Sequence, residues 1–486
     1  MAVTTVGAEL GFQDLDAELE PTELDVEGAL PPWLGGSLLR TGPARWDLPA
    51  GSVRHWFDGL AMLHRFAFAD GRVTYANRFL RSRAFEAAER DGRLAYREFA
   101  TDPCRSAFKR ISTLFDGGSQ LTDNGAVNVT RLGDQYLALT ETPLPVAFDP
   151  GTLRTLGVRG EPPADISTAH PHHDPARGEL VGHGVRLGAR SSYVLYAQRD
   201  VADRRVVGRI PVRRPAYQHS FGLTPRHAVI FEGPFVVNPL ALALADRPFI
   251  ESFRWRPEQG TRFWVVDRER GGTAGPWTSE PFFCFHTVNT YEDDGDLVVD
   301  LLAYEDASVV QSLGLGRLRA GEPVPAPELR RYRLPLGAPG PIRGETLSET
   351  RLELPRIDYR HRNGRPYRIT YGIAVDDGPL FGGGIVKVDV ETGQTERWRE
   401  PVTYAGEPVF VPQPDADRED DGVLLSVVLE PERGRAPRGR PRSGAAPRAI
   451  RLPRPALRRR VSAIACSRGS CQCTCPPGRQ ADRTGT

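Results

Sequence analysis

The chain has 486 residues, and its 63 basic and 62 acidic side chains leave it almost neutral. This balance conceals two regions: residues 433–486 contain 14 arginines and one acidic residue, whereas residues 1–432 carry 49 basic and 61 acidic side chains. The acidic region argues against nucleic acid as a partner, and the lack of any run of 18 apolar residues excludes a membrane-spanning helix.

The start of the chain and the cysteines bear on where the protein works. The first 20 residues are acidic and lack the basic start and apolar run of a signal peptide. Only Cys104 and Cys284 lie in residues 1–432, too few for a disulfide framework. We therefore expect a cytoplasmic protein, because thiols stay reduced in that compartment.

Short strand-like runs dominate residues 1–432. The chain contains 50 glycines and 43 prolines, which is typical of many short strands joined by turns. Few segments show helical periodicity, and the clearest weak candidate is residues 83–98. The runs richest in β-branched and aromatic residues are 72–79, 135–140, 192–198, 227–231, 263–266, 297–304, 367–373 and 422–429. This pattern predicts an all-β fold.

One turn motif recurs between these runs, beginning at Asp149, Asp174, Asp267 and Asp389. In each case an aspartate that can accept bonds from backbone amides is followed by a residue that tolerates positive φ, which makes a tight hairpin corner. The repeated use of this corner favours a β-propeller. A pair of β-sandwiches is the alternative.

Three histidines stand in unusual sequence contexts: His170, His219 and His286. They are 49 and 67 residues apart, so only tertiary structure could assemble a metal site from them, as on the axis of a propeller. Taken singly, each is more often a hydrogen-bonded structural histidine than a ligand. The neighbouring His172 and His173 are expected at the surface.

Three glutamates lie beside prolines in otherwise apolar stretches: Glu141, Glu353 and Glu407. A buried carboxylate is costly when it has no partner. The ring N–H of a metal-bound histidine could supply that partner, because only the other ring nitrogen binds the metal. The alternative is a carboxylate that faces water at a strand end.

Several short motifs follow one another in a fixed order: Gly36-Ser37-Leu38-Leu39-Arg40-Thr41-Gly42-Pro43, His55-Trp56-Phe57-Asp58-Gly59, Ala169-His170-Pro171, His219 with Phe221, Phe285-His286 with Asn289, Glu353-Leu354-Pro355-Arg356 and Glu407-Pro408-Val409-Phe410. With these motifs, residues 20–430 resemble the carotenoid cleavage oxygenases, the family of apocarotenoid oxygenases, stilbene-cleaving enzymes and the retinoid isomerohydrolase. The match departs from the family pattern at Leu60 and Ala61.

The resemblance implies a seven-bladed β-propeller with a non-haem Fe(II) on its axis, held by four histidines. Imidazole ligands suit ferrous iron. With O2 as co-substrate, the implied reaction is dioxygenase cleavage of a conjugated double bond in a carotenoid or apocarotenoid, giving carbonyl products such as retinal-type apocarotenals. No catalytic residue is implied beyond the metal site. The matching positions are the ligands His170, His219 and His286 and the glutamates around them, Glu141, Glu353 and Glu407.

In the resemblance, Glu141 should orient His219 and Glu353 should orient His286. The implied substrate is a lipophilic polyene in an apolar tunnel. The segment from Phe235 to Leu244 resembles the region where family members dip into a membrane, and we favour such peripheral contact over core packing. A stilbene-type phenolic substrate, isomerohydrolysis and a catalytically impaired propeller that binds lipid or a protein partner stay open as alternatives.

The resemblance ends near Arg433. The family's fourth histidine should lie in a Phe-His-Gly motif near the C-terminus, but no histidine follows His361. We therefore divide the chain into a propeller, residues 1–432, and an atypical tail, residues 433–486, and we expect weak activity or none. The tail could be a metal-binding or membrane-binding segment, a disordered segment or the product of a shifted reading frame, which we favour because charge, strand pattern and motif change together. Its cysteines are Cys466, Cys471, Cys473 and Cys475, whose spacing fits no common zinc motif.

Overall fold

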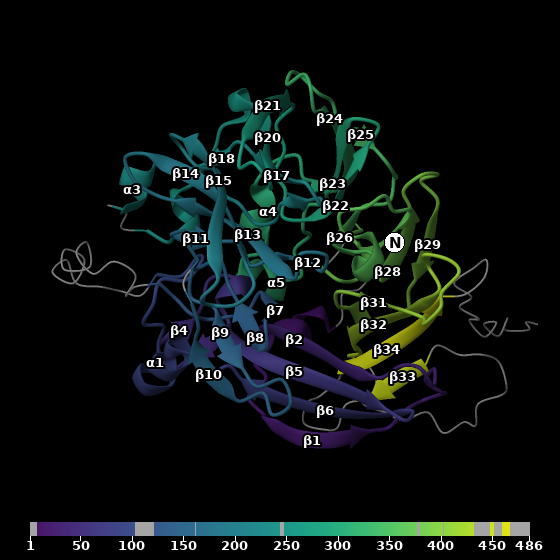
Figure 1. Cartoon of the computed structure of the whole chain (residues 1–486). Helices are drawn as coiled ribbons and strands as arrows, with labels where there is room; N and C mark the ends of the chain where they lie inside the picture. The colour runs from purple at the N-terminus through teal and green to yellow at the C-terminus, as the bar shows by residue number, and fades with distance from the viewer. Residues whose placement is uncertain are drawn as a thin grey trace, which may run out of the picture.

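The computed structural model describes residues 7–102, 121–160, 162–243, 247–376, 380–401, 403–431, 448–451 and 459–466. Its main sheets form a seven-bladed β-propeller in which the blades follow one another in chain order (Figure 1). The predicted all-β propeller is confirmed, and the pair of β-sandwiches is not found. No helix within the described ranges is both long and apolar enough to cross a membrane.

The first four blades are antiparallel sheets, and residues in or close to their innermost strands line the central cavity. From inside outwards, the first blade contains β2 (Gly36–Arg45), β5 (Leu60–Ala69), β6 (Arg72–Phe79) and β1 (Leu19–Leu24), and the second contains β7 (Asn128–Leu132), β8 (Gln135–Leu139), β9 (Val146–Phe148) and β10 (Thr155–Val158). The third blade begins with β11 (Ile166–Ser167) and β12 (His172–Asp174) and continues with β13 (Glu179–Arg186), β14 (Ser191–Gln198) and β15 (Arg204–Val212). The fourth contains β16 (Gly222–Leu223), β17 (His227–Glu232), β20 (Thr261–Asp267) and β21 (Thr273–Ser279).

The last three blades complete the ring in the same way. The fifth blade contains β22 (Thr287–Asp293), β23 (Asp296–Ala303), β24 (Glu328–Pro335) and β25 (Glu345–Thr346). The sixth contains β26 (Leu352–Arg356), β27 (Ile369–Ala374), β28 (Ile385–Asp389) and β29 (Thr395–Trp398). The seventh begins with β30 (Tyr404–Ala405) and β31 (Val409–Pro412) and continues with β32 (Gly422–Leu429), β34 (Arg459–Cys466) and β33 (Arg448–Arg451).

Small elements lie in the connections between strands. Two short ribbons pair β3 (Asp47–Leu48) with β4 (Gly51–Ser52) and β18 (Phe235–Val236) with β19 (Arg254–Trp255). The helical turns are η1 (Ala8–Phe12), η2 (Trp56–Asp58), α1 (Arg83–Asp91), α3 (Pro239–Ala243), η3 (Ile250–Ser252), η4 (Pro257–Gln259), α4 (Ser308–Ser312), α5 (Leu315–Arg319) and α6 (Tyr359–Arg362).

The one predicted helix exists but is shorter than its sequence pattern indicated. Helix α1 begins after Ser82, whose side chain accepts a hydrogen bond from the Phe85 N–H, a normal N-cap. It ends before Gly92, which has φ 67° in the left-handed region. The prediction that the helix continues to residue 98 is wrong, because a glycine in this conformation terminates a helix.

The four predicted aspartate corners are confirmed. In each, one carboxylate oxygen of Asp149, Asp174, Asp267 or Asp389 accepts hydrogen bonds from the backbone N–H groups two and three residues later. Three of these corners join the two outermost strands of a blade: β9 to β10, β20 to β21 and β28 to β29. A local side-chain bond therefore sets the same turn in three blades.

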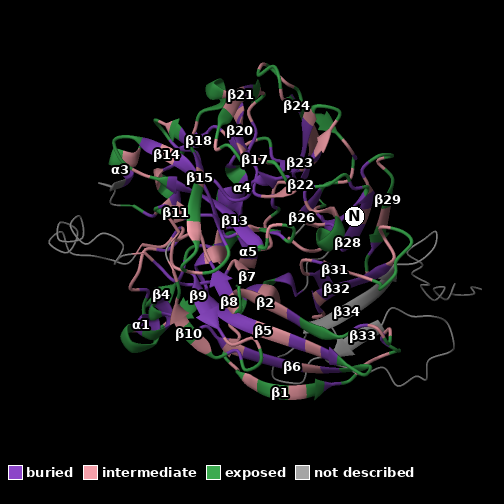
Figure 2. Ribbon diagram, in the orientation of Figure 1, coloured by how far each residue is buried: buried purple, intermediate pink, exposed green. Residues whose placement is uncertain are grey.

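Hydrophobic clusters fill the spaces between neighbouring blades, and one of them closes the ring. Phe66 and Tyr75 of the first blade pack in one cluster with Val423 and Leu425 of the seventh. The strands of these two blades come from opposite ends of the chain and lie side by side (Figure 1). Middle strands such as β13, β17 and β23 are mostly buried, whereas β1 is largely accessible at the rim (Figure 2). Side-chain packing, rather than a shared sheet, joins the ends of the propeller.

Two stretches of residues 433–486 belong to the seventh blade by backbone pairing. Strand β34 pairs with β32 in antiparallel register from Gly422 opposite Cys466 to Leu429 opposite Arg459, and β33 pairs with β34. Cys471, Cys473, Cys475 and most of this segment lie outside the described residues. The interpretations of the segment as disordered, metal-binding or frame-shifted therefore stay predictions.

Candidate metal centre

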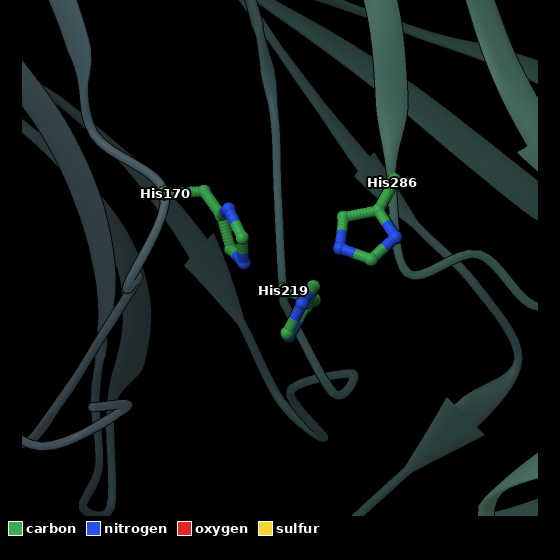
Figure 3. A group of neighbouring side chains, drawn as sticks. All are labelled: His170, His219 and His286. Carbon is green, nitrogen blue, oxygen red and sulfur yellow. The ribbon is translucent and has the colours of Figure 1, made fainter. Parts of the chain in front are cut away.

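Three consecutive blades each place one histidine beside their innermost strand. His170 lies between β11 and β12, His219 lies three residues before β16, and His286 immediately precedes β22. One ring nitrogen of each histidine lies within 4.8 Å of the corresponding atoms of the other two. The rings face a common space (Figure 3). The tertiary structure thus brings together the three histidines that the sequence analysis selected.

His219 is held by a glutamate and a tyrosine. Its Nδ1 lies 2.6 Å from Oε1 of Glu141, and the Tyr217 hydroxyl donates to both oxygens of the same carboxylate at 2.9 Å. Burial raises the pKa of Tyr217 well above its usual value, and the charge of Glu141 adds to this effect, so the phenol stays protonated as a donor. With Nδ1–H donated to Glu141, the lone pair of the ring lies on Nε2.

His286 has the same arrangement with different partners. Its Nδ1 lies 2.7 Å from Oε2 of Glu353, whose other oxygen accepts a bond from the Tyr304 hydroxyl at 2.8 Å. Burial by itself would raise the pKa of Glu353, but the attraction and hydrogen bond of His286, together with the Leu354 N–H and Tyr304, lower it. Glu353 is therefore a carboxylate that accepts from His286 and leaves Nε2 as the free ring nitrogen.

Among the described residues, no carboxylate binds His170 in this way. Its Nε2 is buried and has no hydrogen-bond partner in the part of the chain that the structure describes. Burial first, and then the proximity of His219 and His286, hold the pKa of His170 well below its usual range. A neutral imidazole with a buried, unpartnered nitrogen is the form that binds a metal ion.

Glu407 differs from the other two predicted glutamates. Its carboxylate pairs with Arg356 at 2.7 Å and with Arg40 at 3.7 Å, and Arg40 also donates to the Glu407 carbonyl at 3.1 Å. Burial would raise the pKa of Glu407, but the two arginines lower it. Two cations from the first and sixth blades therefore compensate the charge of the Glu407 carboxylate.

The three histidines border a large apolar cavity of about 1120 Å³. Its wall near them is aromatic: the ring centroids of Phe285 and His219 lie 5.2 Å apart, and those of Phe57 and Phe285 lie 6.2 Å apart. Phe57 and Phe99 are in turn 5.2 Å apart. A cavity of this size and lining suits a long hydrocarbon ligand beside the three imidazoles.

Sequence reasoning missed the tyrosines that bind the two glutamates. Tyr217 lies two residues before His219, a spacing that places side chains on one face of an extended segment, so a signal was present. Tyr304 comes 18 residues after His286 and had no such signal. Of the two histidines expected at the surface, His173 is exposed, whereas His172 is half-buried and bonds to the Phe221 carbonyl at 3.0 Å.

Comparisons with known proteins agree with this arrangement. The family described as retinal pigment epithelial membrane protein matches residues 12–437. The chain is 37% identical to a carotenoid isomerooxygenase of Galleria mellonella, over 84% of this chain and 85% of that protein. It is 33% identical to a beta,beta-carotene 15,15'-dioxygenase of Mus musculus, over 87% of this chain and 85% of that protein.

Solved structures give the same result. A variant of the apocarotenoid oxygenase of Synechocystis superposes with a TM-score of 0.75 at 26% identity, over 87% of this chain and 90% of that chain. A cobalt-substituted form of the Synechocystis protein gives a TM-score of 0.74 at 25% identity over the same shares. The chain therefore belongs to the retinal pigment epithelial membrane protein family of carotenoid oxygenases.

Proposed function

We propose that the protein is a non-haem iron dioxygenase that uses O2 to cleave a conjugated double bond of a carotenoid or apocarotenoid into carbonyl products. The observation that carries this proposal is the cluster of three histidines at the wall of an apolar cavity. The similarity to carotenoid isomerooxygenase and dioxygenase sequences supports the substrate class.

The residues fit the implied iron. The ion would be held by His170, His219 and His286. Nε2 of His170 has no hydrogen-bond partner among the described residues, and the other two histidines use Nδ1 for a glutamate, which leaves their Nε2 for the metal. When bound, ferrous iron supplies the activation of O2. Glu141 and Glu353 keep the rings of His219 and His286 in one orientation and tautomer. The aromatic wall excludes water and positions the polyene.

Iron content and O2-dependent bleaching of a carotenoid test the proposal together. We expect loss of polyene absorbance that requires both Fe(II) and O2, with the product masses showing which bond is cut. Products that carry no oxygen atom from labelled O2 would instead favour isomerohydrolysis. Cleavage of a phenolic stilbene without cleavage of any carotenoid would move the substrate to the stilbene class.

A catalytically impaired propeller is the second candidate. No histidine follows His361 in the sequence, and Glu407 is bound to Arg356 instead of a histidine. Such a protein would bind a carotenoid in the cavity and leave it intact in the presence of Fe(II) and O2. A stable spectral shift of the bound polyene, without bleaching, would distinguish this lipid-binding scaffold from the enzyme.

The segment from residue 433 onward supports a related proposal, that it is read in a shifted frame. Translating the same DNA in the other two frames beyond codon 430 should then reveal a Phe-His-Gly motif. We expect the chain as written to bind less iron and to turn over more slowly than a chain carrying that motif, because it lacks one imidazole ligand. Full iron occupancy and equal turnover in the chain as written would contradict this expectation.

Peripheral membrane contact at residues 235–244 is a further prediction. Leu240 in α3 is 69% exposed, whereas Leu242 is buried. Changing Leu240 to Asp should reduce flotation with liposomes by at least about 10-fold, because inserting a leucine is worth roughly 1.5–3 kcal/mol and a carboxylate opposes insertion. Leu156→Asp, at an exposed leucine in β10, is the matched control and should float normally. Equal flotation of both variants would contradict membrane contact through Leu240.

A further inference from the structure

The cavity wall contains a buried carboxyl group, that of Glu98, which the metal centre does not use. Glu98 lines the cavity and is only 5% exposed. Thr122 bonds to its side chain, but Oε1 of Glu98 is buried without a hydrogen-bond partner among the residues that the structure describes. A buried polar atom of this kind lowers stability unless a ligand satisfies it.

A second buried acid holds Glu98 in place. Asp58, which is fully buried, accepts a hydrogen bond from the Ala100 N–H at 3.1 Å and one from the Thr101 hydroxyl at 2.6 Å. The Glu98 N–H in turn donates to the Thr101 carbonyl at 3.1 Å. These bonds fix the backbone of the segment that places Glu98 at the cavity wall.

The surroundings of Glu98 favour its protonated form. Burial raises the pKa of Glu98 well above its usual value, and the charges of Asp58 and Asp123 raise it further. Burial also raises the pKa of Asp58, to about 6, against the hydrogen bonds that it accepts, so Asp58 is mainly ionised at pH 7. The neighbouring cation Arg97 pairs with Asp102 and with the Arg247 carbonyl. A protonated carboxyl offers one O–H donor and one carbonyl acceptor.

Two contacts connect Glu98 with the residues around the metal centre. Thr122, its hydrogen-bond partner, accepts a bond from the Thr142 hydroxyl at 2.7 Å through its backbone carbonyl, and Thr142 follows Glu141 in the chain. Phe99, the next residue, lies 5.9 Å from Tyr217 between ring centroids. A polyene extending from the histidines along this aromatic wall would bring its outer part towards Glu98.

We propose that Glu98 donates a hydrogen bond to an oxygen atom of the polyene, so that the cavity prefers a hydroxyl- or carbonyl-bearing polyene to the unsubstituted hydrocarbon. This inference rests on the proposed function, because it takes a polyene as the occupant. A hydrocarbon leaves the buried carboxyl unsatisfied, whereas a hydroxyl or carbonyl oxygen accepts a hydrogen bond from its O–H group. Glu98 is a specificity-determining residue in this role and takes no part in bond cleavage.

The experiment measures equilibrium binding to the full chain without O2, by the absorbance shift of three probes: β-carotene, its dihydroxy derivative zeaxanthin and its diketo derivative canthaxanthin. We expect at least one oxygenated probe to bind about 5- to 100-fold more tightly than β-carotene, the range expected for one buried hydrogen bond. The two oxygenated probes distinguish a hydroxyl from a carbonyl as the preferred acceptor.

Three variants separate recognition from a structural role. Glu98→Leu should lose the preference and be at least as heat-stable without ligand as the unaltered protein, because it removes an unsatisfied buried group. Glu98→Gln keeps an N–H donor and should retain most of the preference. Glu86→Leu, at an exposed acid on α1, should leave both the preference and the stability unchanged.

The outcomes distinguish this inference from the proposed function. Equal affinity of the unaltered protein for all three probes, or an undiminished preference in Glu98→Leu, would overturn the role of Glu98 while leaving a polyene-cleaving enzyme intact. Failure of every probe to bind would overturn both. The comparison of the three probes uses only the unaltered protein. Equal affinity for them would therefore overturn the role of Glu98 even if Glu98→Leu failed to fold.

Discussion

Changing His286 to alanine is expected to weaken metal binding at least about 100-fold, since even the residues behind a metal ligand contribute 10- to 100-fold to affinity. The ring of His286 is one of three whose nitrogens lie within 4.8 Å of one another, and Glu353 already orients it. Anaerobic titration with Co(II), followed by visible absorbance, measures the affinity directly. Fe(II) should also raise the melting temperature of the unaltered protein and not that of the variant.

The matched control is His173→Ala. This exposed histidine bonds to the Arg131 carbonyl at 2.8 Å and lies outside the cluster of three. Its Co(II) titration should superimpose on that of the unaltered protein. If His286→Ala retained full affinity while folding normally, these histidines would not form the metal site.

Changing Arg268 to alanine is expected to destabilise the propeller by about 3 kcal/mol, because it leaves two buried carboxylates without their shared cation. Arg268 follows β20, and its side chain is 2% exposed. It contacts Asp174 at 2.6 Å and Glu179 at 3.0 Å, both in the third blade, and donates to the Thr224 carbonyl at 2.7 Å. The bond network therefore joins the third and fourth blades, which carry His170 and His219.

Urea unfolding of Arg268→Ala beside Arg270→Ala measures this contribution. Arg270 lies in the same turn with its side chain exposed, and its loss should change stability by less than about 0.5 kcal/mol. Arg268→Met keeps much of the packing volume and removes the charge, so it should be destabilised nearly as much as Arg268→Ala. Equal stability of Arg268→Ala and Arg270→Ala would show that the carboxylates find other partners, such as Arg205 beside Glu179.

All seven blades contribute to the candidate site. The first blade contributes Arg40, which pairs with Glu407. Glu141, His170, His219, Glu353 and Glu407 come from the second, third, fourth, sixth and seventh blades, and His286 comes from the fifth. No two of the histidines share a sheet. The distances between the histidines therefore depend on how the blades pack against one another. A substitution that weakens the packing between blades should also lower the affinity for the metal.

The sequence by itself determined the local features of this protein. Strand β6 spans residues 72–79 and β32 spans residues 422–429, as their patterns of β-branched and aromatic residues predicted. The aspartate corners were predictable because Asp149 and its counterparts bond only to backbone a few residues away. The three histidines and the glutamates beside two of them could be named because the family motifs occur in order along the chain.

Only the tertiary structure decided which of these residues meet and what completes the site. Glu407 matched a family glutamate in the sequence, but its partners Arg356 and Arg40 are 51 and 367 residues away in the chain and were not predicted. Tyr304 and Glu98 likewise gain their significance from neighbours on other segments. The physical reason is that burial and charge compensation depend on distances between blades, and a sequence pattern specifies distances only within a strand or a turn.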